Sequence, residues 1–308
     1  MTMRHVTFRQ LKVFEAAARS LSFSRAATEL HLTQPGVSMH VKQLESSAGL
    51  PLFERVGKKL FLTEAGRELL HHAHEALRAL KDAEDTLDAL RGLRGGRISI
   101  AVVSTAKYFA PQLLARFRKL HPAVDIRLSV SNREIVVGQL VGNEVDLAIM
   151  GRPPQTMEST AVRFAQHPLV IIAAPDHPLA GRRRIPVARM AGETFLVREP
   201  GSGTRSAMQQ FFDEHGVAIK VGMEMASNET IKQAVMAGMG ISFISRHTVG
   251  LELESGRLVL LDVKGLPVMR HWHVAHLAAK RLSPAAQAFK TFALAHGSDV
   301  LKTLAGAD

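Results

Sequence analysis

Five side chains between residues 34 and 42 have the types and the spacing that reading DNA bases requires. Gln can bond adenine as both donor and acceptor, Ser can bond several bases, a methyl-bearing side chain can contact thymine, and Lys can reach phosphate or guanine. At about 3.6 residues per turn these five positions share one side of a helix. They are Gln34, Pro35, Ser38, Met39 and Lys42.

A second set of polar and basic residues, beyond residue 100, has the types that bind an anion. Hydroxyls, Lys, Arg and the exposed N–H groups at helix starts all favour phosphate or carboxylate. Because the carboxyl ends of parallel strands meet at one edge of a sheet, we expect these residues to converge on an effector with more than one anionic group. Each residue alone is as consistent with ordinary surface charge. The candidates are Ser104, Thr105, Lys107, Asn132, Arg133, Arg152, Arg198, Thr204, Arg205 and Asn228.

No pattern indicates an enzyme or a metal site. Serines, histidines and acids are plentiful, but none sits in a nucleophile elbow, and the loop at 201–205 lacks the Gly-Lys-Ser/Thr ending of a phosphate-binding P-loop. His71, His72 and His74 have no carboxylate at metal-ligand spacing, and the histidines at 271–276 would need further ligands. We therefore expect no catalytic residues, no metal and no cofactor.

Two short helices joined by a tight turn must position the base-reading residues. The first is expected to begin near Ser24, capped by Ser22 or Ser24. The second is expected to begin after Thr33 as N-cap, with Pro35 in its first turn, and its buried stripe is Val37, Val41 and Leu44. This is the pattern of a helix-turn-helix whose second helix enters the major groove. The alternative is a purely structural three-helix subdomain.

Phe8 to Leu62 resembles the N-terminal winged helix-turn-helix of the LysR-type transcriptional regulators. The matching motifs are FRQLKVFEAAARSLSFSRAATELHLTQPGVSMHVKQLE and GLPLFERVGKKLFLTEAGRELL. The resemblance implies a β-hairpin wing beside the DNA, with 60–62 as its returning strand. Its cations would contact phosphates, which position a protein without specifying sequence; the alternative for Lys58 and Lys59 is an ordinary solvated pair. The cations are Arg55, Lys58 and Lys59.

Composition limits the classes of protein to which the chain can belong. The chain has 308 residues, 46% of them hydrophobic, which suits about two globular domains. We find no apolar run long enough to cross a membrane and no signal-peptide core, so we expect a cytoplasmic protein. The net charge of +11 extends into residues 96–308, where it could serve an anionic ligand or simply be surface.

Residues 63–90 are expected to form one linker helix. Seven residues recur in steps of four and three, an a/d seam that pairs two chains; the alternative is packing on the helix's own domain. The segment also resembles the linker helix that dimerises LysR-type regulators, and 91–96 reads as a hinge. The seam residues are Leu69, Ala73, Ala76, Leu80, Ala83, Leu87 and Leu90.

Residues 97–308 alternate short strand and helix patterns, which predicts α/β lobes built on parallel sheets. The apolar run at 169–174 is expected to form one of these strands. This part resembles the family's effector-binding domain, which has two lobes like the type 2 periplasmic solute-binding proteins. The expected organisation is therefore a largely α-helical winged helix-turn-helix (1–62), a linker (63–90), a hinge (91–96) and the effector domain (97–308).

Four stretches narrow the resemblance to the Calvin-cycle (RuBisCO) operon regulators within the LysR-type family: VVSTAKYFAP, SNREIV, DLAIMGRPP and FLVREPGSGTRSAM. This resemblance implies an activator of carbon-fixation genes that senses a phosphorylated metabolite or NADPH. It also implies partners: double-stranded operator DNA, RNA polymerase, and further copies of the chain in a dimer or tetramer. The alternatives are a LysR-type regulator of another pathway that senses a different small anion, or a solute-binding protein or enzyme on the same fold.

Overall fold

The computed structural model describes residues 3–57, 59–90, 95–154 and 158–304. These residues form two compact units, each described here by itself. One unit contains Met1–Leu87, and the other contains Asp88–Val141 and Val145–Asp308.

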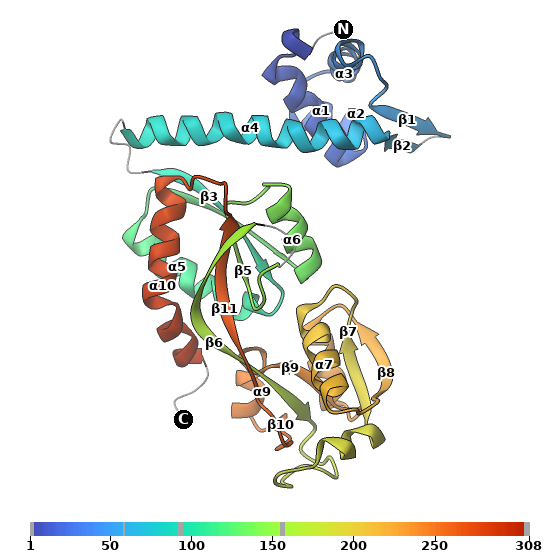
Figure 1. Ribbon diagram of the computed structural model, residues 1–308, viewed down its shortest axis with the longest axis vertical. Coiled ribbons are helices and arrows are strands. Elements are labelled where there is room, and N and C mark those ends of the chain that lie inside the picture. The colour runs from blue at the N-terminus through green and yellow to red at the C-terminus, as the bar shows by residue number, and fades with distance from the viewer. Residues whose placement is uncertain (1–2, 58, 91–94, 155–157, 305–308) are drawn as a thin grey trace. The chain divides into compact units, whose positions relative to one another are not determined.

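The N-terminal unit is a helical bundle with a two-stranded hairpin (Figure 1). Its elements are η1 (Met3–His5), α1 (Phe8–Ser20), α2 (Phe23–Glu29), α3 (Gln34–Ala48), β1 (Phe53–Val56), β2 (Lys59–Leu62) and α4 (Glu64–Leu90).

Side-chain caps fix where α2 and α3 begin. Ser22 is the N-cap of α2, and Thr33 is the N-cap of α3, its hydroxyl accepting a hydrogen bond from the Gly36 amide at 3.2 Å. Small residues of α1 and α2 let α3 approach closely, so that Ala26, Val37 and Val41 are buried in one core. The expected helix-turn-helix is therefore present, with Ser22 rather than Ser24 as the first cap.

The first turns of α4 pack on their own unit, which corrects part of the predicted dimer seam. Ala73 is 1% exposed and lies in a core with Phe14, Leu44 and Leu52, and Leu69 packs against the same core. An a/d spacing cannot distinguish an intramolecular partner from an intermolecular one. Further along, Leu80 is 40% exposed and Leu87 is 54% exposed.

The burial of the other predicted seam positions does not show which surface they pack against. Ala76 is half-buried and Ala83 is exposed. The backbone of Leu90 closes α4, but its side chain lies outside the described residues, as do residues 91–94 of the predicted hinge.

The C-terminal unit has two lobes (Figure 1). Lobe I has a parallel arrangement of strands, with β3 between β4 and β5, and its helices bury one continuous core. Its elements are β3 (Gly96–Val103), η2 (Ala106–Tyr108), α5 (Ala110–Leu120), β4 (Val124–Ser131), α6 (Arg133–Val141), β5 (Leu147–Met150) and α10 (Pro284–Leu304).

Lobe II carries a second, parallel strand pair, β7 with β8. Its elements are η3 (Val187–Gly192), β7 (Thr194–Arg198), α7 (Gly203–Glu214), β8 (Lys220–Met225), α8 (Asn228–Met236), β9 (Ser242–Ser245), η4 (Arg246–Thr248), α9 (Gly250–Glu254) and β10 (Val259–Leu260).

Two long strands, β6 (Ser159–Ala173) and β11 (Val268–Leu277), run side by side from lobe I into lobe II (Figure 1). They pair antiparallel with each other, β11 also pairs antiparallel with β5, and β6 pairs antiparallel with β9. The expected parallel pairs are present in both lobes, whereas the connecting strands are antiparallel, and the strand expected at 169–174 is only the end of β6. The first half of β6 was not recognised as a strand because polar residues such as Arg163 and Gln166 interrupt its apolar pattern.

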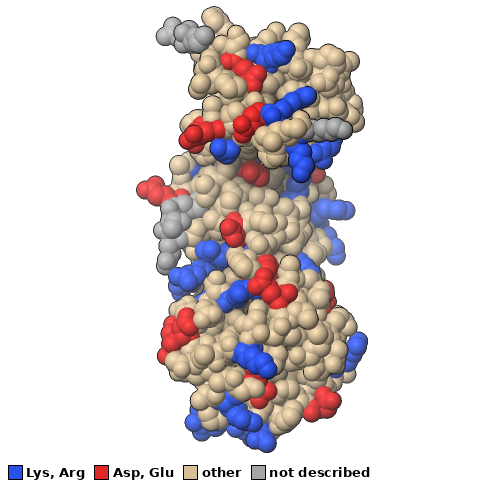
Figure 2. All heavy atoms as spheres, turned by 90° about the vertical axis from the view of Figure 1, so that its right-hand side faces the viewer, with Lys and Arg blue, Asp and Glu red and all other residues tan. Residues whose placement is uncertain are grey.

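The described helices include no membrane span, and one face of the molecule shows charges of both signs. None of the described helices combines the length and the apolar character needed to cross a bilayer. On the face shown in Figure 2, basic and acidic side chains are interspersed. The net positive charge does not by itself locate a binding site, so we look for places where particular cations lie close together.

Candidate nucleic-acid interface and ligand cleft

The five base-reading candidates lie together along an open groove on α3. Gln34, Pro35, Ser38, Met39 and Lys42 line it, joined by Gln43 and Ser46. The opposite side of α3 is held in the core, so that the groove faces solvent on a rigid helix. Thr33 contributes the N-cap of that helix and is itself exposed.

A second hollow lies between the start of α2, the start of α3 and the hairpin. Gln34, Arg55 and Lys59 line it, together with Arg25, which the sequence reading missed. Arg25 is held by a hydrogen bond to the Ser20 carbonyl. In the hairpin, Val56 pairs with Lys59 and Gly57 has a φ of 63°, a left-handed conformation that favours glycine. Lys58 lies outside the described residues.

A cleft with about 430 Å³ of space, part of it open to solvent, lies in the C-terminal unit. Its walls come from both lobes and from the strands that connect them, and they include six of the ten predicted effector residues. These are Ser104, Thr105, Arg133, Arg152, Arg198 and Thr204.

Three arginines lie close together in the cleft, and the pKa values of two of them, Arg133 and Arg270, are lowered. Burial lowers the pKa of Arg133, and the nearby Arg152 lowers it further. Burial also lowers the pKa of Arg270, with smaller effects from Arg152 and Arg133. None of the described residues that line the cleft is a carboxylate. An anion entering this space would relieve the repulsion among the three guanidinium groups.

Arg198 also lines the cleft, but its charge is already compensated. Its side chain is bonded to Glu199 through Nε at 2.7 Å and through Nη2 at 2.8 Å. Nη1 donates to Asn228 at 2.7 Å, and Nη2 donates to Ser104 of lobe I at 3.0 Å. Arg198 therefore joins the lobes rather than offering an open cation.

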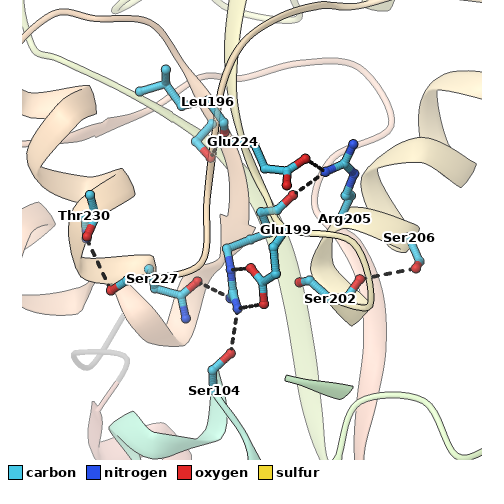
Figure 3. A network of polar contacts seen from close by, with 12 residues as sticks. Ser104, Leu196, Glu199, Ser202, Arg205, Ser206, Glu224, Ser227 and Thr230 are labelled. Carbon is cyan, nitrogen blue, oxygen red and sulfur yellow. Dashed lines mark hydrogen bonds and ion pairs between the residues drawn. The ribbon is translucent and has the colours of Figure 1, made fainter. Parts of the chain in front are cut away.

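The remaining four predicted effector residues do not line the cleft. Arg205 donates to the Arg198 carbonyl at 2.9 Å and pairs with Glu224 (Figure 3). Lys107 lies 4.0 Å from Glu229. Asn132 accepts from the Ile135 amide at the start of α6. Asn228 touches Arg198, as described above.

The strand-end reading also missed cleft residues. His167 and Arg270 lie within β6 and β11, and Gly151 and Ser202 contribute to the same wall. No strand-end rule finds His167 or Arg270, because the two long strands pass across the cleft, whereas Gly151 directly follows β5 and Ser202 lies between β7 and α7. Within the described part of the chain, no three His, Cys, Asp or Glu side chains are grouped to hold a metal ion.

Together these features define a class of protein: a winged helix-turn-helix for reading DNA, combined with a two-lobed unit for binding a small molecule. Family models agree on both parts. Residues 8–67 match the bacterial regulatory helix-turn-helix protein, lysR family, and residues 91–298 match the LysR substrate binding domain. The chain belongs to the LysR-type transcriptional regulators. Its relatives are regulators rather than enzymes, as expected.

Individual relatives are similar over nearly the whole chain. It is 53% identical to the RuBisCO operon transcriptional regulator of Allochromatium vinosum, over 96% of this chain and 97% of that one. It is 51% identical to the regulator CfxR of Cupriavidus necator, over 97% and 94% of the two chains.

Two solved structures are also similar. The regulatory domain of CcmR from Synechocystis PCC6803, in complex with 2-PG, is 44% identical with a TM-score of 0.63, covering 65% of this chain and 96% of that one. Full-length CbnR with its target DNA is 22% identical with a TM-score of 0.66, covering 93% and 98%, and shows likeness of fold.

Proposed function

We propose that this regulator activates carbon-fixation genes of the Calvin cycle. The observation that carries the proposal is the 53% identity to a relative named as a RuBisCO operon regulator. A further relative, at 41% identity, is named as the transcriptional activator CmpR. The regulator would act in the cytoplasm, where its operator and RNA polymerase are.

The effector in this proposal is a small, phosphorylated metabolite. Arg133, Arg152 and Arg270 form a cationic wall with no carboxylate among the described lining residues. Hydroxyls of Ser104, Thr105 and Thr204 line the same cleft. The space inside it that a water-sized group can enter is only about 30 Å³, which favours a compact anion over NADPH. The name of the CcmR structure supports 2-PG as a probe.

The DNA-binding part of the proposal places α3 in the major groove and the hairpin against phosphates. Gln34, Ser38 and Met39 would contact base edges, whereas Arg55, Lys58 and Lys59 would contact the backbone. Exposed residues of α4 would pair two chains, and contacts between C-terminal units would build a tetramer that bends an interrupted palindrome. An effector that binds one lobe arrangement more tightly would shift this assembly.

Footprinting tests the proposal. The full chain is bound to DNA that carries a carbon-fixation promoter, with and without 2-PG, sugar bisphosphates or NADPH. We expect a protected region that shortens with one phosphorylated compound. A footprint that none of them changes contradicts the effector class, and the absence of a footprint at carbon-fixation promoters contradicts the gene target.

A further inference from the structure

His167 lies buried in the cleft wall with no hydrogen-bond partner. The residue is 5% exposed, and neither ring nitrogen has a partner among the described residues. A neutral imidazole carries one donor and one acceptor, and burying both unsatisfied is costly. Because His167 lines the cleft, a ligand bound there is within reach of the ring.

The ring is fixed before any ligand arrives. It stacks on Trp272, with ring centroids 3.9 Å apart and planes inclined by 18°. On another side it meets Gly151, where a Cβ atom would lie 2.7 Å from Nδ1. A side chain at position 151 would therefore displace the imidazole. Trp272 and Gly151 together hold the buried imidazole of His167 in one orientation.

Among the described residues, the charged and titratable groups that face His167 are histidines and arginines, one of which is paired with Glu199. Arg270 and His273 approach from β11, and His247 from η4. Arg133 and Arg152 line the same cleft from lobe I, as does Arg198 from lobe II, with its charge matched by Glu199.

Burial is the main cause that holds the pKa of His167 well below its ordinary value, and His247, Arg270 and His273 lower it further. The imidazole is therefore neutral at pH 7 when the cleft is empty. An anion placed against it reverses the local potential and favours the imidazolium.

We propose that His167 contacts the bound anion directly and takes up one proton from solvent as the anion binds. The proton is added to the free imidazole nitrogen, no other bond changes, and an N–H then donates to the anion. This inference rests on the proposed effector role of the cleft. Binding of a non-titrating anion should weaken by up to tenfold per pH unit wherever proton uptake is complete.

Calorimetry of the full chain with sulfate tests the proposal. Sulfate stays a dianion across pH 6 to 8, so only the protein titrates, whereas a phosphate ester also titrates near pH 6. Titrations in two buffers of different ionisation enthalpy measure the protons taken up. We expect uptake approaching one proton per cleft and an affinity that falls as pH rises; 2-PG should show the same uptake once its own ionisation is subtracted.

His167→Gln keeps a hydrogen-bond donor but cannot titrate in this range. Its sulfate binding should persist through the arginines, with a flat pH profile and no buffer-dependent heat. The matched control is His121→Gln, a histidine of lobe I that stacks on Phe117 away from the cleft; it should behave as the wild type.

The outcomes separate the two proposals. Sulfate binding by the wild type without proton uptake overturns the role of His167 and leaves the anion cleft standing, and this measurement needs no variant to fold. Uptake that survives in His167→Gln also overturns it. If neither sulfate nor 2-PG binds at any pH, both the cleft's effector role and the role of His167 fall.

Discussion

Arg198 and Glu199, adjacent in sequence at the end of β7, form a two-pronged ion pair with N···O distances of 2.7 and 2.8 Å. The Arg198 side chain is 2% exposed. Since Arg198 also bonds Ser104 of lobe I, the pair fixes a cation at the junction of the lobes.

Glu199→Gln should therefore strongly destabilise the C-terminal unit. Removing one partner of a buried pair leaves an uncompensated charge, which costs about 3 kcal/mol or more. Urea unfolding of the full chain measures the effect. The control is Glu224→Gln, which breaks the more exposed pair with Arg205 and should cost under about 1 kcal/mol. Equal losses in the two variants would show that Arg198 does not depend on Glu199.

Arg270→Gln should weaken binding of 2-PG by roughly tenfold or more, because it removes a charge-assisted bond worth about 1.5 kcal/mol or more. Arg205→Gln removes the same charge from a residue that pairs with Glu224 outside the cleft, and it should change affinity less than about threefold, on the order of 0.6 kcal/mol. Calorimetric titration of both variants makes the comparison. If Arg205→Gln proves the more damaging change, the ligand does not bind in the cleft described here.

Lys42→Ala should weaken operator binding by about tenfold and reduce the salt slope by about one if Lys42 contacts phosphate. The residue lies on the exposed groove of α3. Gel-shift titrations at several salt concentrations measure both quantities. The control, Lys302→Ala, removes the same charge from an exposed residue of α10 and should leave both unchanged. Wild-type affinity in Lys42→Ala would refute the assignment of α3 as the reading helix.

The helix-turn-helix was predictable because its determinants are local. Thr33 caps α3 by accepting a hydrogen bond from the amide three residues further along. The spacing of Val37, Val41 and Leu44 predicts which face of the helix is buried. The a/d seam of α4 was harder to interpret, because the spacing of apolar residues predicts that one face is buried but does not identify the surface that covers it. Ala73 is covered by its own unit.

The cleft was predictable only in part. Strand ends and helix starts led to Ser104, Arg133 and Arg152, because parallel strands deliver those ends to one edge. His167 and Arg270 lie within long antiparallel strands, where alternation alone does not say which face meets the other lobe. Pairings across the fold, such as Arg205 with Glu224, have no local signature at all.

Acid should destabilise the C-terminal unit through its buried histidines. Burial lowers the pKa of His247 to about 4 from an ordinary value of 6.5, so the unfolded chain binds more protons between those values. The free energy of unfolding should fall as pH drops from about 6.5 to 4, by roughly 3 kcal/mol at most from this residue.

Unfolding of His247→Gln against pH checks this contribution. The amide can still accept the hydrogen bond that Trp272 Nε1 donates to His247 at 3.3 Å, but it does not titrate. Its pH dependence should be shallower than that of the wild type over the same range. A profile parallel to the wild type would assign the acid sensitivity to other groups.

The exposed stretch of α4 should hold two chains together through Leu80 and Leu87. Both leucines are more than a third exposed, whereas Ala73, near the start of the seam, is buried within its own unit, so pairing should centre on the second half of the helix. Burying a leucine contributes about 2 kcal/mol. The double variant Leu80→Glu, Leu87→Glu should therefore weaken pairing by at least about a hundredfold and halve the assembly mass in sedimentation equilibrium. Leu251→Glu introduces the same charge at a leucine of α9 that is 78% exposed and should leave the mass unchanged. An unaltered mass in the double variant would mean that chains associate through other surfaces.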